Sequence, residues 1–361
     1  MFVWRFKMVP PYLKYIGKKT ATLCVMLLIA VYLTVLIANL GGYIDTVLKS
    51  QIVTTVHQTV ARSPEFQNLP PEKQKEMIHT LIDQQFKAYG LDKPFFPHRS
   101  FIYFKKALIF KLGRAMFLRS AGGSSSIKAI ILERLPWTML LFTTGTLISA
   151  FLGIYTGLHM GRKALSVFDR GMSVFAVMTT SIPPWFFGIL ALLIFSYRLG
   201  WFPSGGWVEQ FIGVPWHKLV VDILWHLALP LGCWVFSNFG YWAYTTRNLV
   251  IHIMHEDYVT AARAKGVPED LIMRRYVLKP AAPPIVTMVS LAVIASWTGA
   301  IITETVFKWY GLGYLYWQAI MTLDAPIIIG LTVVYAYLLV ATVIMLELLY
   351  GYLDPRVRVG G

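Results

Sequence analysis

The segment Asp257–Pro284, DYVTAARAKGVPEDLIMRRYVLKPAAPP, is a charged, helix-forming insert between two long apolar runs. An acid at its start, followed by alanines, predicts a first helix over Asp257–Lys265. Gly266 comes where a helix C-terminus commonly takes a left-handed residue, and Pro268 suits the first turn of a second helix. The prolines that are expected to end this second helix are Pro280, Pro283 and Pro284. The segment therefore predicts a helix, a glycine turn and a second helix.

The apolar runs around this insert indicate a membrane protein. Of the 361 residues, 56% are hydrophobic and 14% are charged, whereas a water-soluble domain carries about 25% charged residues. A helix needs roughly 20 apolar residues to cross the hydrocarbon core, and six uncharged runs are long enough. We therefore predict an all-α membrane protein with six transmembrane helices. A seventh run, 309–323, is shorter and is interpreted as interfacial or re-entrant.

The six runs divide the chain into segments with different expected roles. The boundaries are 1–19 for an N-terminal segment, 20–44 for the first span, 45–134 for an insert, 135–353 for a five-span domain and 354–361 for a tail. Within the five-span domain we expect spans over 135–161, 171–197, 223–246, 280–303 and 325–350, with a charged loop over 247–279. A proline start, a glycine end and apolar residues at helical spacing predict a helix over 70–90 in the insert. The insert is interpreted either as a decoration or as a lid or docking surface.

The distribution of positive charge predicts the orientation in the membrane. The segment 1–19 contains lysines and arginine but no acid, so it is expected to stay in the cytoplasm. This places the loop 247–279 and the tail in the cytoplasm and the insert outside. The insert contains 14 Lys and Arg residues, but a segment of that length crosses largely regardless of its charge. We expect a multi-pass membrane protein with both termini in the cytoplasm.

Two patterns inside the spans suggest structural or pathway roles. Ser181 is followed by Pro183 and Pro184, and paired prolines kink a helix, so this site is a candidate pathway-lining position or a simple packing kink. Small residues also recur every fourth position in the second span, which lets another helix approach closely. These helix-packing candidates are Ser149, Gly153, Gly157 and Gly161.

Catalytic chemistry is not visible in the sequence. There is no G-x-x-x-x-G-K-[ST] phosphate loop, no H-E-x-x-H and no nucleophile elbow, so we predict no catalytic, metal or cofactor-binding residue. The two cysteines fall in predicted spans and are interpreted as packing residues. The net charge is +15, and the positively charged residues flank the spans. Their position indicates the orientation of the chain in the membrane, so no nucleic-acid partner is expected. The first helix of 257–284 presents small side chains, which fit a groove on another protein.

The segment DYVTAARAKG and the helix after it resemble the EAA loop of ABC importer permeases, in the version found in B-type subunits of the dipeptide/oligopeptide family. Other blocks match in order over 135–358: SIPPWFFG, GWFPSGG, WHLALP, TETVFKWYGLG, LDAPIIIG and LDPRVR. Two positions depart from the general motif, because Thr260 stands where Glu is usual and 276–279 replaces its Ile-x-Leu-Pro ending.

This resemblance implies a type I ABC importer permease fold over 135–353, with a helical extracytoplasmic insert between spans one and two. It implies a second homologous permease subunit, two ATP-binding subunits that hold the ATP, an extracytoplasmic substrate-binding protein and surrounding lipid. The residues implied to couple to an ATPase subunit are Asp257, Tyr258, Ala261, Ala262, Arg263, Ala264, Lys265 and Gly266. The expected substrate is a peptide, and the expected location is the inner or plasma membrane of a prokaryote. The alternatives are an oligosaccharide or another small solute, a stand-alone secondary transporter, or a membrane enzyme.

Overall fold

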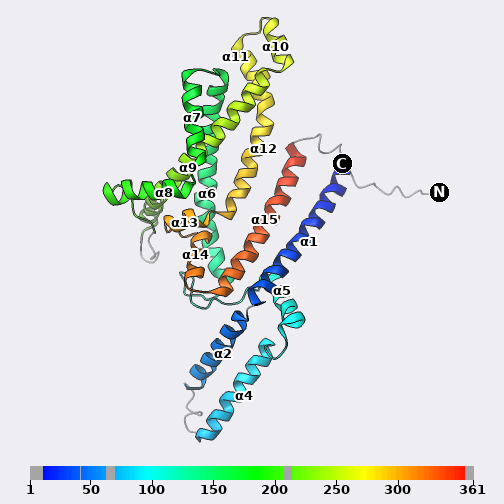
Figure 1. The fold of residues 1–361 in the computed structure, drawn as a ribbon, viewed down its shortest axis with the longest axis vertical. Coiled ribbons are helices and arrows are strands. Elements are labelled where there is room, and N and C mark those ends of the chain that lie inside the picture. The colour runs from blue at the N-terminus through cyan, green and yellow to red at the C-terminus, as the bar shows by residue number, and fades with distance from the viewer. Residues whose placement is uncertain (1–10, 41, 62–69, 207–213, 354–361) are drawn as a thin grey trace, which may run out of the picture. The chain divides into compact units, whose positions relative to one another are not determined.

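The computed structural model describes residues 11–40, 42–61, 70–206 and 214–353. Helices make up all the regular elements in these ranges (Figure 1), and the one β-bridge, between Arg114 and Ser126, is isolated. The predicted all-α class is confirmed. The chain divides into two compact units, the first made of Met1–Thr22, Ile131–Gln318 and Leu338–Gly361, and the second of Leu23–Ile130 and Ala319–Tyr337.

Long apolar helices occur in both units. Five helical segments of the described chain are long and apolar enough to cross a bilayer, and a bent pair brings the number to six if it is one span. Leu141, Phe142, Leu227 and Trp309 belong to one buried core of the first unit. In chain order, the helices from the second to the fourth span are α6 (Ile127–Arg162), α7 (Val167–Ser181), α8 (Pro184–Ala191), η2 (Leu192–Arg198) and α9 (Trp216–Met254).

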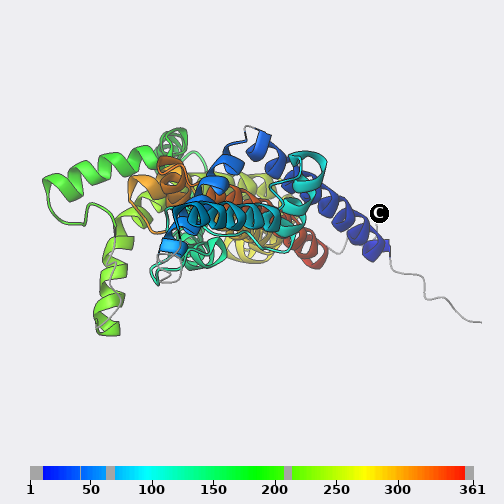
Figure 2. The same cartoon turned by 90° about the horizontal axis from the view of Figure 1, so that it is seen from below.

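The predicted span 171–197 is a bent pair and not a straight helix. α7 ends at Ser181, and α8 with η2 continues at 92° to it, a turn that Figures 1 and 2 show. Ile182 and Pro183 both adopt extended backbone, with ψ values of 129° and 144°. Because proline cannot donate the helical hydrogen bond, the two consecutive prolines interrupt the ladder here. The kink expected from the sequence is therefore a right-angled break.

The fifth span begins earlier than the sequence predicts. One helical segment runs from Glu269 to Thr298, so the expectation that the prolines from Pro280 onward end the second helix is wrong. Proline's fixed φ suits a helix. A π-helical stretch immediately before Pro280 changes the hydrogen-bond pattern at that position. The segment comprises α11 (Glu269–Leu271), η3 (Ile272–Leu278), α12 (Lys279–Ala295) and η4 (Ser296–Thr298). Beyond it come α13 (Ile301–Val306), α14 (Leu312–Met321) and α15 (Ala325–Leu353).

The second unit contains most of the segment between the first two spans. Helix α1 (Pro11–Leu40) packs through Val31 and Val35 on Ala107 and on Val333 of α15. Within the insert, α2 (Tyr43–Ala61) pairs with α4 (Pro71–Tyr89), and η1 (Phe95–Arg99) and α5 (Ser100–Leu108) follow.

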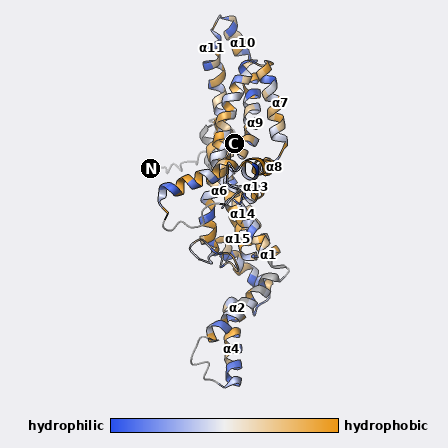
Figure 3. Cartoon of the chain, turned by 90° about the vertical axis from the view of Figure 1, so that its left-hand side faces the viewer, coloured by the Kyte–Doolittle hydropathy of each residue, from blue (hydrophilic) through white to orange (hydrophobic). Residues whose placement is uncertain are grey.

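The helix predicted over 70–90 is confirmed as α4. It ends at Gly90, whose φ of 71° is left-handed. Figure 3 shows hydrophilic residues along much of α4, and its apolar stripe packs on α2. Of the apolar residues at helical spacing in this segment, Met77 is 45% exposed, and the others join that core: Ile78, Leu81, Ile82 and Phe86.

Candidate functional site

The charged segment forms a helical hairpin at the end of α9. Helix α10 (Asp257–Ala264) is followed by Gly266, whose φ of 74° is left-handed. The N–H of Gly266 donates to Arg263 O at 2.9 Å, and that of Val267 donates to Ala262 O at 3.2 Å. A Cβ on Gly266 would meet no atom within 4 Å, so there is room for a side chain. Glycine is favoured here by the left-handed backbone conformation and not by a lack of space. The predicted glycine turn is confirmed.

An apolar core holds the inner face of α10. Val259 and Ala262 are buried in one cluster with Val250 of α9 and with Ile272 and Val277 of η3. Helix α10 therefore packs against both the helix before it and the helix after it. Because of this packing, the hairpin is a compact structural unit and not a loose surface loop.

The outer face of α10 carries small and polar side chains. Of the eight residues implied to couple to an ATPase, Ala262 is buried, and the other seven are exposed: Asp257, Tyr258, Ala261, Arg263, Ala264, Lys265 and Gly266. Partial desolvation and the Glu256 carboxylate raise the pKa of Tyr258 above its usual value. The face suits contact with another protein.

Two ion pairs fasten the hairpin. Arg263 Nε lies 2.7 Å from Glu269 Oε1, across the glycine turn. Arg162, at the end of α6, pairs with Asp270 at the start of the second helix. Each pair is exposed and contributes about 1 kcal/mol or less. The pair to Arg162 joins residues 108 positions apart, so no local sequence pattern indicates it.

A buried ion pair fixes α7 to α9 near the same end of the bundle. Arg247 donates from Nε and Nη2 to the Asp169 carboxylate at 2.6 and 2.8 Å. Asp169 is 1% exposed and also accepts the N–H of Leu165 at 2.8 Å. Ser166 caps α7 by accepting the N–H of Asp169. Sequence reasoning missed this pair, although Asp169 in the first turn after a serine is a capping pattern.

The small residues of α6 lie against α9. A Cβ on Gly153 would come within 2.3 Å of Trp242 Cβ, and one on Gly157 within 2.4 Å of Ala243 O. Gly161 faces Val250 in the same way. Ser149 is buried and donates its hydroxyl to Gly145 O at 2.6 Å. The two helices therefore approach too closely for any side chain at these glycines.

The break between α7 and α8 holds the remaining predicted residues. Ser181 is exposed and donates its hydroxyl to Val177 O at 2.7 Å. Pro183 is exposed and Pro184 half-buried. Their pathway-lining role stays a prediction.

A buried carboxylate organises the segment after the fifth span. Glu304 is 0% exposed and accepts the N–H groups of Gly313 at 2.8 Å and Tyr314 at 3.1 Å, and the hydroxyl of Thr138 at 2.9 Å. Thr138 in turn accepts the N–H of Leu312 at 2.8 Å. The carboxylate thereby caps α14 and ties it to α6. The sequence places Glu304 in the block TETVFKWYGLG, but gives no indication that it is buried.

Additional contacts strengthen the tie between α6 and this segment. The Arg134 guanidinium lies 3.1 Å from the centroid of the Tyr310 ring, and Tyr310 donates its hydroxyl to Glu133 at 2.7 Å. Trp309 donates its indole N–H to Trp137 O at 2.9 Å. In the described ranges there is no group of three or more His, Cys, Asp or Glu side chains that could hold a metal ion.

Comparison with known proteins decides the family. The profile of the family described as "binding-protein-dependent transport system inner membrane component" matches residues 149–359, more than half of the chain. The chain belongs to this permease family. The permease is a multi-pass inner-membrane protein with a type I importer permease fold.

Two relatives span most of the permease. It is 30% identical over 298 residues to the inner membrane ABC transporter permease protein YejB of Escherichia coli O157:H7, covering 81% of this chain and 78% of YejB. It is 29% identical over 232 residues to the oligopeptide transport system permease protein AppB of Bacillus subtilis (strain 168), covering 64% of this chain and 72% of AppB. The resemblance expected from the EAA-like segment is thereby confirmed.

Proposed function

We propose that this permease is one of two similar subunits that form the pathway of an ATP-driven peptide importer. Two separate ATP-binding subunits hold and hydrolyse the ATP, and an extracytoplasmic binding protein delivers the peptide. The oligopeptide name of AppB supports the substrate class, and the missing phosphate loop supports the division of labour. Both termini and the α10 hairpin lie in the cytoplasm.

The observation that carries this proposal is the connection from the hairpin to the fifth span. Helix α10 docks in a groove of an ATP-binding subunit with its exposed alanines. Val259 and Ala262 pass its displacement to η3 through their shared core. Because the helical segment from Glu269 to Thr298 contains no break, a push on its first residues moves the fifth span directly. The Asp270–Arg162 pair couples the same displacement to α6.

Steric bulk on the exposed face of α10 tests the docking. Ala261→Trp leaves the hairpin core intact because Ala261 is exposed, but it obstructs a closely fitting groove. We expect peptide-stimulated ATP hydrolysis by the reconstituted complex to fall at least ten-fold. Ala88→Trp is the matched control, since Ala88 is an exposed alanine near the end of α4, and it should retain wild-type hydrolysis. Full stimulation in the Ala261→Trp complex would refute the docking role.

The substrate class needs its own measurement. With the cognate binding protein present, short peptides should stimulate hydrolysis, whereas oligosaccharides at the same concentration should not. Stimulation by oligosaccharides alone would overturn the peptide assignment and leave the ATP-driven importer standing. Ion-driven uptake by the purified permease without ATP-binding subunits would overturn both.

A further inference from the structure

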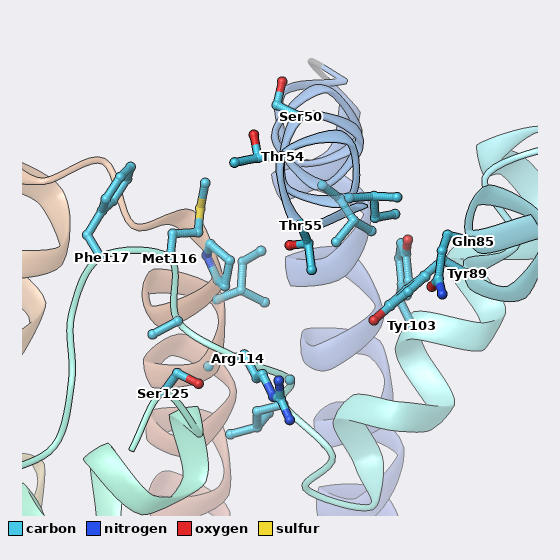
Figure 4. A pocket seen from close by; sticks show the side chains of 18 of the residues that line it. Ser50, Thr54, Thr55, Gln85, Tyr89, Tyr103, Arg114, Met116, Phe117 and Ser125 are labelled. Carbon is cyan, nitrogen blue, oxygen red and sulfur yellow. The ribbon is translucent and has the colours of Figure 1, made fainter. Parts of the chain in front are cut away.

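A large hollow lies within the second unit, among α1, α2, α4, α5 and the start of α15. Its volume is about 1250 Å³, larger than many small-molecule sites. Figure 4 shows Thr55 of α2, Tyr103 of α5 and the loop residue Arg114 around it. This space is lined by the insert and by parts of α1 and α15, and it plays no part in the proposed coupling.

The polar part of the lining is basic and rich in hydroxyl groups. It includes four cationic side chains and no Asp or Glu: Lys106, Lys111, Arg114 and Arg119. Across the ranges that the structure describes, none of these four forms an ion pair. Threonine and serine side chains of α2 line the hollow as well. Cations and hydroxyl donors without a carboxylate among them favour an anion with several oxygen acceptors, such as a phosphate group.

The arrangement of nearby acids leaves that positive charge uncompensated. Asp45 is occupied by Arg99, which donates to both of its oxygens at 2.6 and 2.7 Å. Asp324 is 0% exposed and accepts the N–H groups of Met116, Phe117 and Leu118 at 2.8–3.1 Å. This bonding also fixes the loop that carries Arg114, so the cationic wall is held in place before any ligand arrives.

The floor of the hollow is apolar and comes from membrane spans. Val35 belongs to the apolar segment Gly17–Ile37, and Ile329 and Gly330 belong to the apolar segment Ala325–Leu346. On the neighbouring α5, Phe101 is 61% exposed and Ile102 44% exposed, beside Lys105 and Lys106. Exposed apolar side chains next to lysines are typical of a helix at the membrane surface. The hollow therefore combines apolar residues of the candidate spans, here called its floor, with basic residues, here called its rim.

We propose that this hollow binds an anionic phospholipid, with the phosphate headgroup against Lys111 and Arg114 and the acyl chains on the apolar floor. A soluble anion would use the rim but not the floor, whereas a phospholipid matches both. The bound lipid would brace the insert at the membrane surface. The inference requires that α1 and α15 span the bilayer and is independent of the substrate and of ATP coupling.

Native mass spectrometry of the full-length permease tests this binding. The protein, in a neutral detergent, is titrated with phosphatidylglycerol and, separately, with phosphatidylcholine of the same acyl chains. We expect phosphatidylglycerol to bind at least ten-fold more tightly. The double variant Lys111→Gln/Arg114→Gln should lose about thirty-fold of that affinity, since each cation near an anionic lipid contributes about 1 kcal/mol.

The matched control is Lys73→Gln/Lys75→Gln on α4, which removes the same charge from exposed side chains outside the lining. This control should bind phosphatidylglycerol like the wild type. If the double variant does not fold, Lys111→Gln alone should still lose about five-fold. Equal binding of the two lipids, or equal losses in lining and control variants, would overturn the proposal.

Competition separates a lipid from a soluble ligand. Inorganic phosphate or an acidic peptide, added in ten-fold excess over phosphatidylglycerol, should not displace the lipid. Displacement by either would overturn the lipid assignment. The peptide-stimulated ATP hydrolysis of the reconstituted complex is measured separately. A permease without lipid preference could therefore still be an importer subunit, and the lipid site and the importer function are refuted by different results.

Discussion

Replacing Glu304 with alanine should unfasten α14 from α6. The change removes an acceptor from two backbone N–H groups, those of Gly313 and Tyr314, and from the hydroxyl of Thr138. A buried donor left without a partner costs about 1–3 kcal/mol. Three such donors would together cost about 3–9 kcal/mol. Because Tyr314 and Thr138 can relax toward other acceptors, we expect a total near the lower end of that range, about 4 kcal/mol.

The conservative variant separates hydrogen bonding from charge. Glu304→Gln can keep its oxygen as the acceptor for the N–H groups of Gly313 and Tyr314, but its NH2 group then faces the Thr138 hydroxyl, which loses its acceptor. We expect it to cost about 2 kcal/mol. Glu76→Ala is the matched control, because Glu76 is exposed on α4, and it should cost less than about 0.5 kcal/mol.

Thermal unfolding in detergent, followed by tryptophan fluorescence, provides the measurement. Trp309 and Trp137 lie at this junction, so their emission reports on its opening. At about 2 °C per kcal/mol for a chain of this size, Glu304→Ala should lower the Tm by about 8 °C and Glu304→Gln by about 4 °C. A Tm for Glu304→Ala within 1 °C of the control would refute the reasoning that this carboxylate caps α14.

The other stability predictions concern the contacts between helices. Gly157→Leu should cost about 3 kcal/mol by overpacking, since a Cβ there would lie 2.4 Å from Ala243 O, whereas Gly171→Leu should be tolerated because no atom lies within 4 Å. Both variants are measured by the same unfolding assay, and equal Tm values would contradict the close approach of α6 and α9. The ion pairs give a second comparison. Asp169→Asn should cost about 3 kcal/mol because it leaves Arg247 without its buried charged partner. Glu269→Gln, which breaks an exposed pair, should cost less than about 1 kcal/mol, and a reversed order would show that the exposed pair fixes the fold.

The features that could be predicted from the sequence are those set by local chemistry. The helix over Asp257–Ala264 and the turn at Gly266 follow from alanines, an early acid and a residue without Cβ. The apolar stripe of α4 and the glycine that ends this helix also follow from residues close together in the chain. The spans follow from length and hydrophobicity, because the bilayer fixes both.

The features that escaped prediction depend on residues far apart in the chain. Asp324 bonds to N–H groups more than 200 positions away, and Glu304 bonds to Thr138 across 166 positions. No local pattern marks such partners. Helix α2 was not anticipated because its threonines and valines have modest helix propensity, and its packing on α4 compensates for that.

The prolines of α12 misled the sequence reasoning for another reason. Pro280 lies in the first turn of α12, and Pro283 and Pro284 lie just beyond it. Proline breaks helices in water, but a membrane span tolerates it where local π or 3₁₀ adjustments satisfy the freed backbone groups. Here the π-helical stretch Ile272–Leu278 immediately precedes them. The continuity of hairpin and span therefore had to be seen in the structure.

Photo-crosslinking from α10 tests the central claim most directly. Benzoylphenylalanine replaces Tyr258, an exposed aromatic residue of α10, and separately Tyr89, an exposed aromatic residue at the end of α4. The permease is co-expressed with its ATP-binding and binding-protein partners, and the irradiated complex is resolved on a gel. We predict a crosslink from position 258 to an ATP-binding subunit and none from position 89 to that subunit. An intact complex without a crosslink from position 258 would contradict the account.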